Sequence, residues 1–188
     1  MQLPAYRQQD TGTLPGPPHL AVRYLYGIDS LRACMAKVAV GGTFDPIHDG
    51  HIALLRRAFE LGKGGEVVIG LTSDEMARSS RIRSVRSYES REEDLRTVIK
   101  KCFGIDDVHI TKIEDQCGPS IYENFDFIVV SPETLPMAEK INRLRAKKGL
   151  PPLQISRIEY QMAQDKVRIS STRISEGKID RHGRLLTG

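Results

Sequence analysis

The chain has 188 residues, of which 39% are hydrophobic and 28% are charged, and its formal net charge is +4. This length suits one catalytic-size domain with a sizeable core, and the basic excess is too mild to make nucleic acid the expected partner. The three cysteines form no CxxC pair, and no run of about 18 apolar residues occurs. The composition therefore argues against a disulfide framework, a zinc knuckle and a membrane span, and it fits a cytoplasmic protein.

Residues 1–34 differ in composition from the rest of the chain. Four of the ten prolines fall here, the segment has no clear hydrophobic period, and it lacks the features of a signal or transit peptide. We predict a disordered amino-terminal extension. Because Met35 directly precedes the first expected strand, a translation start assigned too early is an alternative, and the mass of the native protein would distinguish the two.

Strand and helix patterns alternate from residue 37 onward. Residues 37–41 form an apolar run that ends in glycines, which is typical of a buried parallel strand. Residues 49–61 carry an apolar stripe that predicts a helix, and glycines follow it. Residues 66–71 predict the second strand.

The second half of the chain continues this alternation. Residues 88–103 predict an amphipathic helix with Leu95, Val98, Ile99 and Cys102 on its apolar stripe, and with a surface pair between Glu92 and Arg96. Strands are expected at 108–113, 127–131 and 153–160, and helices at 136–148 and 170–176. This order predicts an α/β fold for residues 35–188, a single domain with a doubly wound parallel sheet whose ligand lies at the carboxyl ends of the strands.

The sequence GGTFDPIHDGH, residues 41–51, follows the first strand. Its glycines allow a close approach of the backbone to a ligand, and His48 and His51 lie about one helical turn apart at the start of a helix. The amino end of a helix favours phosphate. We interpret the segment as a nucleotide phosphate site, and a zinc pair is a weaker alternative because no third ligand is evident.

A second polar segment, ISSTRI, covers residues 169–174. Hydroxyls at a helix start are also ordinary caps, but Ser170, Ser171 and Thr172 stand beside Arg173. Hydroxyls, backbone N–H groups and a guanidinium together can hold a polyphosphate. The arginines that follow the second strand are a third candidate group for an anionic substrate, namely Arg78, Arg81, Arg83 and Arg86. Arg91 on the next helix can add to it.

These segments resemble the HxGH superfamily of nucleotidyltransferases, whose signature is matched at residues 48–51. Within it, the chain is similar to the archaeal and eukaryotic family of phosphopantetheine adenylyltransferases. The likeness rests on VGGTFDPIHDGH (40–51), GLTSDEMA (70–77), VVSPET (129–134), INRLR (141–145) and ISSTRI (169–174). The resemblance implies a Rossmann-like nucleotidyltransferase domain. It also implies reversible adenylyl transfer from ATP to 4'-phosphopantetheine in coenzyme A biosynthesis, with Mg²⁺ as cofactor.

The resemblance also implies roles for individual residues. His48 and His51 are the expected catalytic residues, and no protein ligand to a metal is expected. The ATP-binding set comprises Gly41, Gly42, Thr43, Phe44, Gly50, Ser170, Ser171, Thr172 and Arg173. Thr43 is expected between the two substrates, and the acceptor-binding candidates are Thr43, Arg81, Arg83 and Arg91. Neither a nucleic acid nor a membrane is an expected partner, and the oligomeric state stays open, monomer included.

Two other kinds of function are alternatives for this protein. A cytidylyltransferase or a nicotinamide mononucleotide adenylyltransferase would share the fold, but cytidylyltransferases usually have an RTEGIST-like segment where this chain has ISSTRI. A non-catalytic module that binds nucleotide or RNA is the other class. The low aromatic content of 6% and the lack of tryptophan argue against a stacking surface for single strands.

Overall fold

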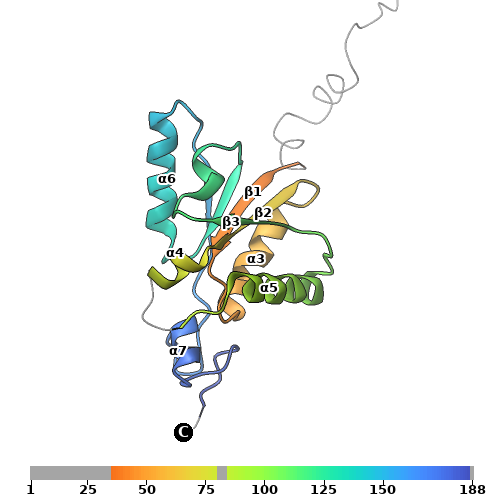
Figure 1. Ribbon diagram of the computed structural model, residues 1–188, viewed down its shortest axis with the longest axis vertical. Coiled ribbons are helices and arrows are strands. Elements are labelled where there is room, and N and C mark those ends of the chain that lie inside the picture. Colours follow the sequence, from red (N-terminus) through yellow and green to blue (C-terminus); the bar gives the residue numbers. More distant parts are fainter. Residues whose placement is uncertain (1–34, 80–83, 187–188) are drawn as a thin grey trace, which may run out of the picture. The chain divides into compact units, whose positions relative to one another are not determined.

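The computed structural model describes residues 35–79 and 84–186 (Figure 1). One five-stranded parallel sheet has the order β3-β2-β1-β4-β5. Its strands are β1 (Lys37–Gly42), β2 (Glu66–Thr72), β3 (His109–Ile113), β4 (Phe127–Val130) and β5 (Gln154–Arg157). The chain winds outward from β1 in both directions, which confirms the predicted doubly wound α/β fold. The prediction for residues 1–34 lies outside the described residues.

The helices lie in the connections between the strands, except α7, which follows β5. They are α3 (Asp49–Leu61), α4 (Asp74–Ser79), α5 (Tyr88–Phe103), the 3-10 helix η1 (Gly118–Ile121), α6 (Leu135–Lys147) and α7 (Ser171–Ser175). The bounds of α3 and α5 are those predicted. The sequence pattern did not predict α4 and η1, because a helix of one or two turns is too short to show a hydrophobic period. None of the described helices is both long and apolar enough to cross a membrane.

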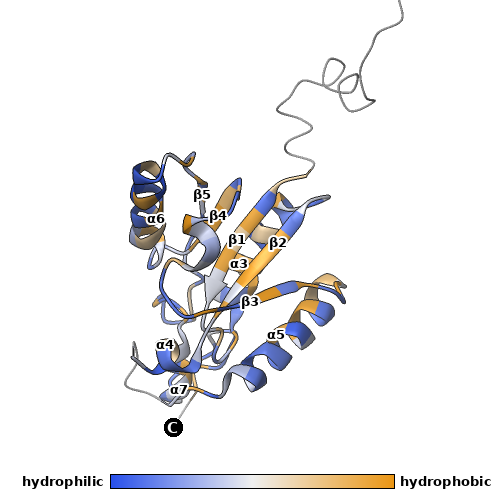
Figure 2. Cartoon of the chain, turned by 45° about the horizontal axis from the view of Figure 1, so that its top comes forward, coloured by the Kyte–Doolittle hydropathy of each residue, from blue (hydrophilic) through white to orange (hydrophobic). Residues whose placement is uncertain are grey.

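Two apolar clusters lie on opposite faces of the sheet. Val38, Val40 and Ile69 pack against α3 and α5 on one face, while Ala39, Val68 and Ile128 pack against α6 on the other. Figure 2 shows this as hydrophobic strands between helices whose outer faces are hydrophilic. Because alternate residues of a strand point to opposite faces, both faces of the central strands are buried.

The buried stripe of α5 differs from the prediction. Cys102 is exposed rather than buried, and Arg91 is fully buried with Leu95 and Ile99. These three residues recur at four-residue spacing, so the stripe begins with a charged residue one helical turn before the first apolar one. The predicted surface pair is confirmed, since Arg96 Nη2 lies 2.7 Å from Glu92 Oε1.

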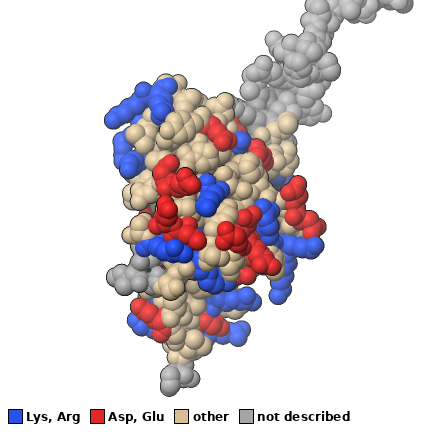
Figure 3. Space-filling view, in the orientation of Figure 1, with Lys and Arg blue, Asp and Glu red and all other residues tan. Residues whose placement is uncertain are grey.

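The last part of the chain, residues 158–186, forms a small unit below the carboxyl ends of the strands (Figure 1). Ala163, Ile169 and Ile179 form its own apolar cluster, and two isolated antiparallel bridges join Met162 to Arg168 and Ile179 to Leu185. Acidic and basic side chains are interspersed on the face shown in Figure 3, and basic ones gather at the far end of α6. The β1–α3 loop lies next to this carboxyl-terminal unit, because Ser171 and His182 of the unit contact Pro46 and Asp49.

Candidate active site

The loop between β1 and α3 brings both predicted histidines to one point. The imidazole rings of His48 and His51 are stacked with centroids 3.9 Å apart and an interplanar angle of 24°. Phe44, whose φ of 51° is left-handed, packs its ring against His51 at 5.0 Å. A Cβ on Gly50 would lie 2.9 Å from His48 Cε1, so only glycine leaves room for that ring. The HDGH spacing therefore fixes the position of both imidazoles.

Backbone hydrogen bonds at the start of α3 leave little for a ligand. The first four N–H groups of α3 already have protein acceptors: Arg181 O, His48 Nδ1 and, for two of them, His48 O. A helix end usually presents such groups to an anion. Here any phosphate contact must come from side chains, with the helix dipole as a supporting field. His48 Nδ1 accepts the Gly50 N–H at 3.1 Å, so the neutral ring carries its proton on Nε2.

The hydroxyl segment at α7 is joined directly to this loop. Ser171 donates to the Pro46 carbonyl at 3.2 Å, and Ser170 caps α7 by accepting the Arg173 N–H at 3.4 Å. Thr172 is exposed. One residue of the segment thus ties it to the histidine loop, a second caps its own helix, and a third faces solvent.

Arg173 is held by the turn that precedes α7. Its guanidinium forms an ion pair with Asp165 and donates to the carbonyls of Val167 and Arg168. This hydrogen bonding lowers the pKa of Asp165 below its ordinary value, so the carboxylate is ionised at neutral pH. The structure therefore orients Arg173 near the α7 hydroxyls and already pairs its charge with an acid.

Residues 181 and 182 are hydrogen-bonded to the first residue of α3, a contact that the sequence did not predict. His182 Nδ1 lies 3.0 Å from Asp49 Oδ1, and Arg181 Nε donates to His182 Nε2 at 3.0 Å. Because Nε2 accepts, the ring proton lies on Nδ1 and is donated to Asp49. The Asp49 N–H in turn donates to the Arg181 carbonyl at 3.2 Å. The side chain and the backbone N–H of Asp49, which directly follows His48, are thus both bonded to the end of the chain.

A cavity of about 360 Å³ opens beside this loop on the α6 face of the sheet. Thr43 and Thr72 line it where β1 and β2 end, and the VVSPET loop contributes Glu133. On the far side the wall is formed by η1 and the residues before it, including Cys117. The lining is largely apolar with a few polar groups at the strand ends, which is typical of a small-molecule site.

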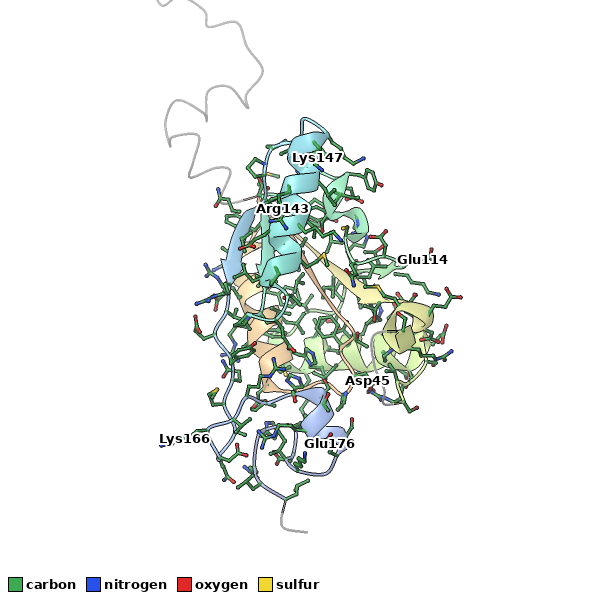
Figure 4. All side chains as sticks on the ribbon, turned by 90° about the vertical axis from the view of Figure 1, so that its left-hand side faces the viewer. Asp45, Glu114, Arg143, Lys147, Lys166 and Glu176 are labelled. Atoms are coloured by element: carbon green, nitrogen blue, oxygen red, sulfur yellow. The ribbon has the colours of Figure 1, made fainter. Side chains whose placement is uncertain are left out.

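The predicted acceptor-site arginines fall in different places. Arg81 and Arg83 lie outside the described residues. Arg91 is fully buried and is not among the residues that line the cavity. Arg86, from the candidate group of arginines after the second strand, forms an ion pair of 2.8 Å near the amino end of α5 with Asp45, which is labelled in Figure 4. The sequence offered no signal for this pair, because its members are 41 residues apart.

A protein cage for a metal ion is not part of this arrangement. Among residues 35–79 and 84–186, no group of three or more His, Cys, Asp and Glu side chains could hold a metal. Mg²⁺ commonly binds through substrate phosphates with only one or two carboxylates.

Several known proteins are similar to this chain. Residues 39–177 match the model of the cytidylyltransferase-like family. A phosphopantetheine adenylyltransferase from Methanosarcina mazei is 55% identical over 153 residues, which cover 80% of this chain and 97% of that protein. The corresponding protein from Methanosarcina acetivorans is 52% identical, with 80% and 96% covered. The chain belongs to the phosphopantetheine adenylyltransferase family.

A solved structure from Archaeoglobus fulgidus, described as a protein of unknown function, has the same fold. It matches with a TM-score of 0.61 and 41% identity, over 66% of this chain and 99% of that one. Membership of the phosphopantetheine adenylyltransferase family confirms the resemblance that the HDGH and ISSTRI segments predicted. It also means that the neighbouring superfamily activities are not favoured.

Proposed function

We propose that the chain transfers the adenylyl group of ATP to 4'-phosphopantetheine, giving dephospho-coenzyme A and pyrophosphate in a reversible step of coenzyme A biosynthesis. One observation carries the proposal. In a chain 55% identical to a phosphopantetheine adenylyltransferase, the stacked His48 and His51 lie beside hydroxyls that Ser171 ties to the same loop. The two imidazoles and the start of α7 therefore lie at the same loop, at the carboxyl ends of the strands, which supports the proposal.

The chemistry that such a site must supply is limited. The nucleophile is a phosphate oxygen of the acceptor, which is already ionised near neutral pH, so no general base is needed. Catalysis then depends on in-line positioning and on stabilising the charge that grows on the α-phosphate and the leaving pyrophosphate. Donors held rigidly by the protein meet that demand.

The two histidines are the proposed donors to the reacting phosphates. His48 carries its proton on Nε2, and both rings are fixed by stacking and by the packing of Phe44. Because the N–H groups at the start of α3 are engaged with protein acceptors, the imidazoles rather than the backbone of α3 would bind the nucleotide. The two histidines would therefore carry this role alone at the start of α3, because the first four backbone N–H groups of that helix already have protein acceptors.

The hydroxyls of α7 and Arg173 are the proposed ligands of the β- and γ-phosphates. Ser170 and Thr172 lie on the same short helix as Arg173, whose guanidinium is oriented by Asp165. Mg²⁺, when bound to ATP, would neutralise part of the phosphate charge. Gly41, Gly42 and Phe44 complete the nucleotide side of the proposal by letting the loop backbone approach the ligand.

The cavity beside Thr43 is the proposed site of the acceptor. Its lining combines apolar side chains with polar groups at the strand ends, which suits a long, flexible acceptor that has a phosphate at one end. Arg81 and Arg83 stay candidates for that phosphate. We also propose that the protein works in the cytoplasm. The free thiols of Cys102 and Cys117 support such a reducing compartment.

The decisive experiment follows product formation from defined substrates. Purified protein, ATP, Mg²⁺ and 4'-phosphopantetheine should yield dephospho-coenzyme A, identified by mass spectrometry, and an equal amount of pyrophosphate. Nicotinamide mononucleotide as acceptor, and CTP in place of ATP, serve as comparisons. Pyrophosphate release that requires either of these instead would contradict the proposal, and so would RNA binding without any pyrophosphate.

A further inference from the structure

A line of three polar groups runs from the interior of the protein to the acceptor cavity. Arg91 Nη1 donates to Thr72 Oγ1 at 3.3 Å, and the Thr72 hydroxyl donates to Thr43 Oγ1 at 3.1 Å. Arg91 is fully buried, and the two threonines are 7% and 6% exposed. Both threonines line the cavity. A buried cation is therefore connected to the cavity through two hydroxyl groups.

The guanidinium that begins this line is fixed on all sides. Nε donates to the Arg86 carbonyl at 3.0 Å, Nη1 also donates to the Thr43 carbonyl at 3.3 Å, and Nη2 pairs with Asp74 Oδ1 at 2.8 Å. Arginine has only donors and stays charged, so it cannot reverse the direction of any of these bonds. The start of the line thus has a fixed polarity.

The hydrogen bonds from Arg91 to Thr72 and from Thr72 to Thr43 run in one direction. Thr72 Oγ1 accepts from Arg91, so its single proton is available for Thr43 Oγ1. Thr43 Oγ1 accepts that proton, which leaves its own proton available to a further acceptor. Within residues 35–79 and 84–186, the structure shows no protein acceptor for it. The remaining place is the cavity that Thr43 lines.

We propose that Arg91 and Thr72 are positioning residues that orient the Thr43 hydroxyl as a donor to an anionic oxygen of the acceptor substrate. The inference rests on the proposed function and names how the site recognises the acceptor phosphate. A charged group at the start of a chain of hydrogen bonds strengthens each following bond. Arg91 then influences the acceptor without touching it, which reconciles its burial with a role in acceptor binding.

A structural role alone would make a different prediction. If Thr72 served only to satisfy Arg91, its loss would lower stability and disturb both substrates alike. If it orients Thr43, its loss acts on the acceptor in particular and depends on the Thr43 hydroxyl. The two readings are separated by kinetics with each substrate and by a double-mutant cycle.

The test compares Thr72→Val, which keeps the shape and removes the hydroxyl, with Thr72→Ser, which keeps the hydroxyl. We expect Thr72→Val to lower kcat/KM for 4'-phosphopantetheine about tenfold, with the KM for ATP within about twofold of the wild type. Thr72→Ser should restore most of the loss. Thr72→Ala removes the same hydroxyl without adding volume and must show the same loss as Thr72→Val. Thr97→Val, an exposed threonine on α5, is the matched control and should leave both constants unchanged.

The double variant decides whether the effect passes through Thr43. In a Thr43→Val background, adding Thr72→Val should have little further effect on acceptor kinetics, because the oriented hydroxyl is already gone. Additive losses would overturn the inference, as would a Thr72→Val enzyme with wild-type acceptor kinetics or a Thr72→Ser enzyme that is not restored. Product formation by the wild type in the same assay tests the proposed function separately. The ratios between the variants and the wild type test the positioning role.

Discussion

Arg145 on α6 supports one wall of the acceptor cavity from behind, and its replacement by methionine should have a large and specific cost. The side chain is fully buried. Nη1 donates to the carbonyls of Ser120 and Glu123 at 2.7 and 2.8 Å, and Nε donates to the Pro151 carbonyl at 2.8 Å. Ser120 belongs to η1, which lines the cavity. Arg145→Met removes all three bonds at once.

The magnitude follows from what is lost and what is relieved. Each buried carbonyl that loses its donor costs about 1–3 kcal/mol. Against this, burial lowers the pKa of Arg145, and the buried Nη2 has no hydrogen-bond partner among the described residues, so removing the cation relieves an unfavourable desolvation. We expect a net loss of about 2–5 kcal/mol in the free energy of unfolding, which is a large part of the roughly 5–15 kcal/mol typical of a domain.

Urea unfolding followed by far-UV circular dichroism measures this loss. Arg143→Met is the matched control, because Arg143 lies two residues earlier on the exposed side of α6 (Figure 4) and should change stability by less than about 0.5 kcal/mol. The KM of Arg145→Met for 4'-phosphopantetheine should also rise more than its KM for ATP, since η1 lines the cavity that we propose for the acceptor. A stability loss below about 1 kcal/mol would refute this account of Arg145.

Three further substitutions test the nucleotide side of the site. His51→Ala should lower turnover by about two orders of magnitude or more, because it removes a donor to the developing charge; near-normal rates would exclude the catalytic role. Arg173→Ala should weaken ATP binding, measured by calorimetry, by about tenfold or more, and unchanged affinity would argue against the phosphate role. His182→Ala removes an exposed hydrogen bond to Asp49. Because we expect this contact to hold α3 in its reactive position, kcat should fall by up to about fivefold, which corresponds to about 1 kcal/mol in the barrier. His182→Asn, which keeps a donor, should recover part of this, and equal rates for all three enzymes would show that the contact does not position α3.

Local patterns predicted the elements whose burial follows a simple period. The strands and the helices α3 and α5 are examples, because apolar residues at regular spacing must face a core. Arg91 shows where this reasoning stops. A search for regularly spaced apolar residues does not include a buried arginine. It predicted that Cys102 is buried, although Cys102 is exposed.

The histidine and hydroxyl segments could be recognised because each site depends on neighbouring residues. The contacts that complete the site could not be recognised in this way. Asp45 meets Arg86, and Asp49 meets His182, only after the sheet has brought distant segments together. No spacing rule connects such pairs, since their separation in the chain reflects the path of the fold rather than the period of a helix or strand.

The fastening of the carboxyl-terminal unit to α3 has a consequence for the order in which the protein matures. Ser171 and Pro46 are 125 positions apart, and His182 and Asp49 are 133 positions apart. Contacts between such distant positions form late, after loop closure over most of the chain. During synthesis, the sheet and α3 can assemble while the last segment is still in the ribosome. The candidate site is then completed only when residues 171–182 emerge, so we expect chains that lack them to fold without consuming ATP.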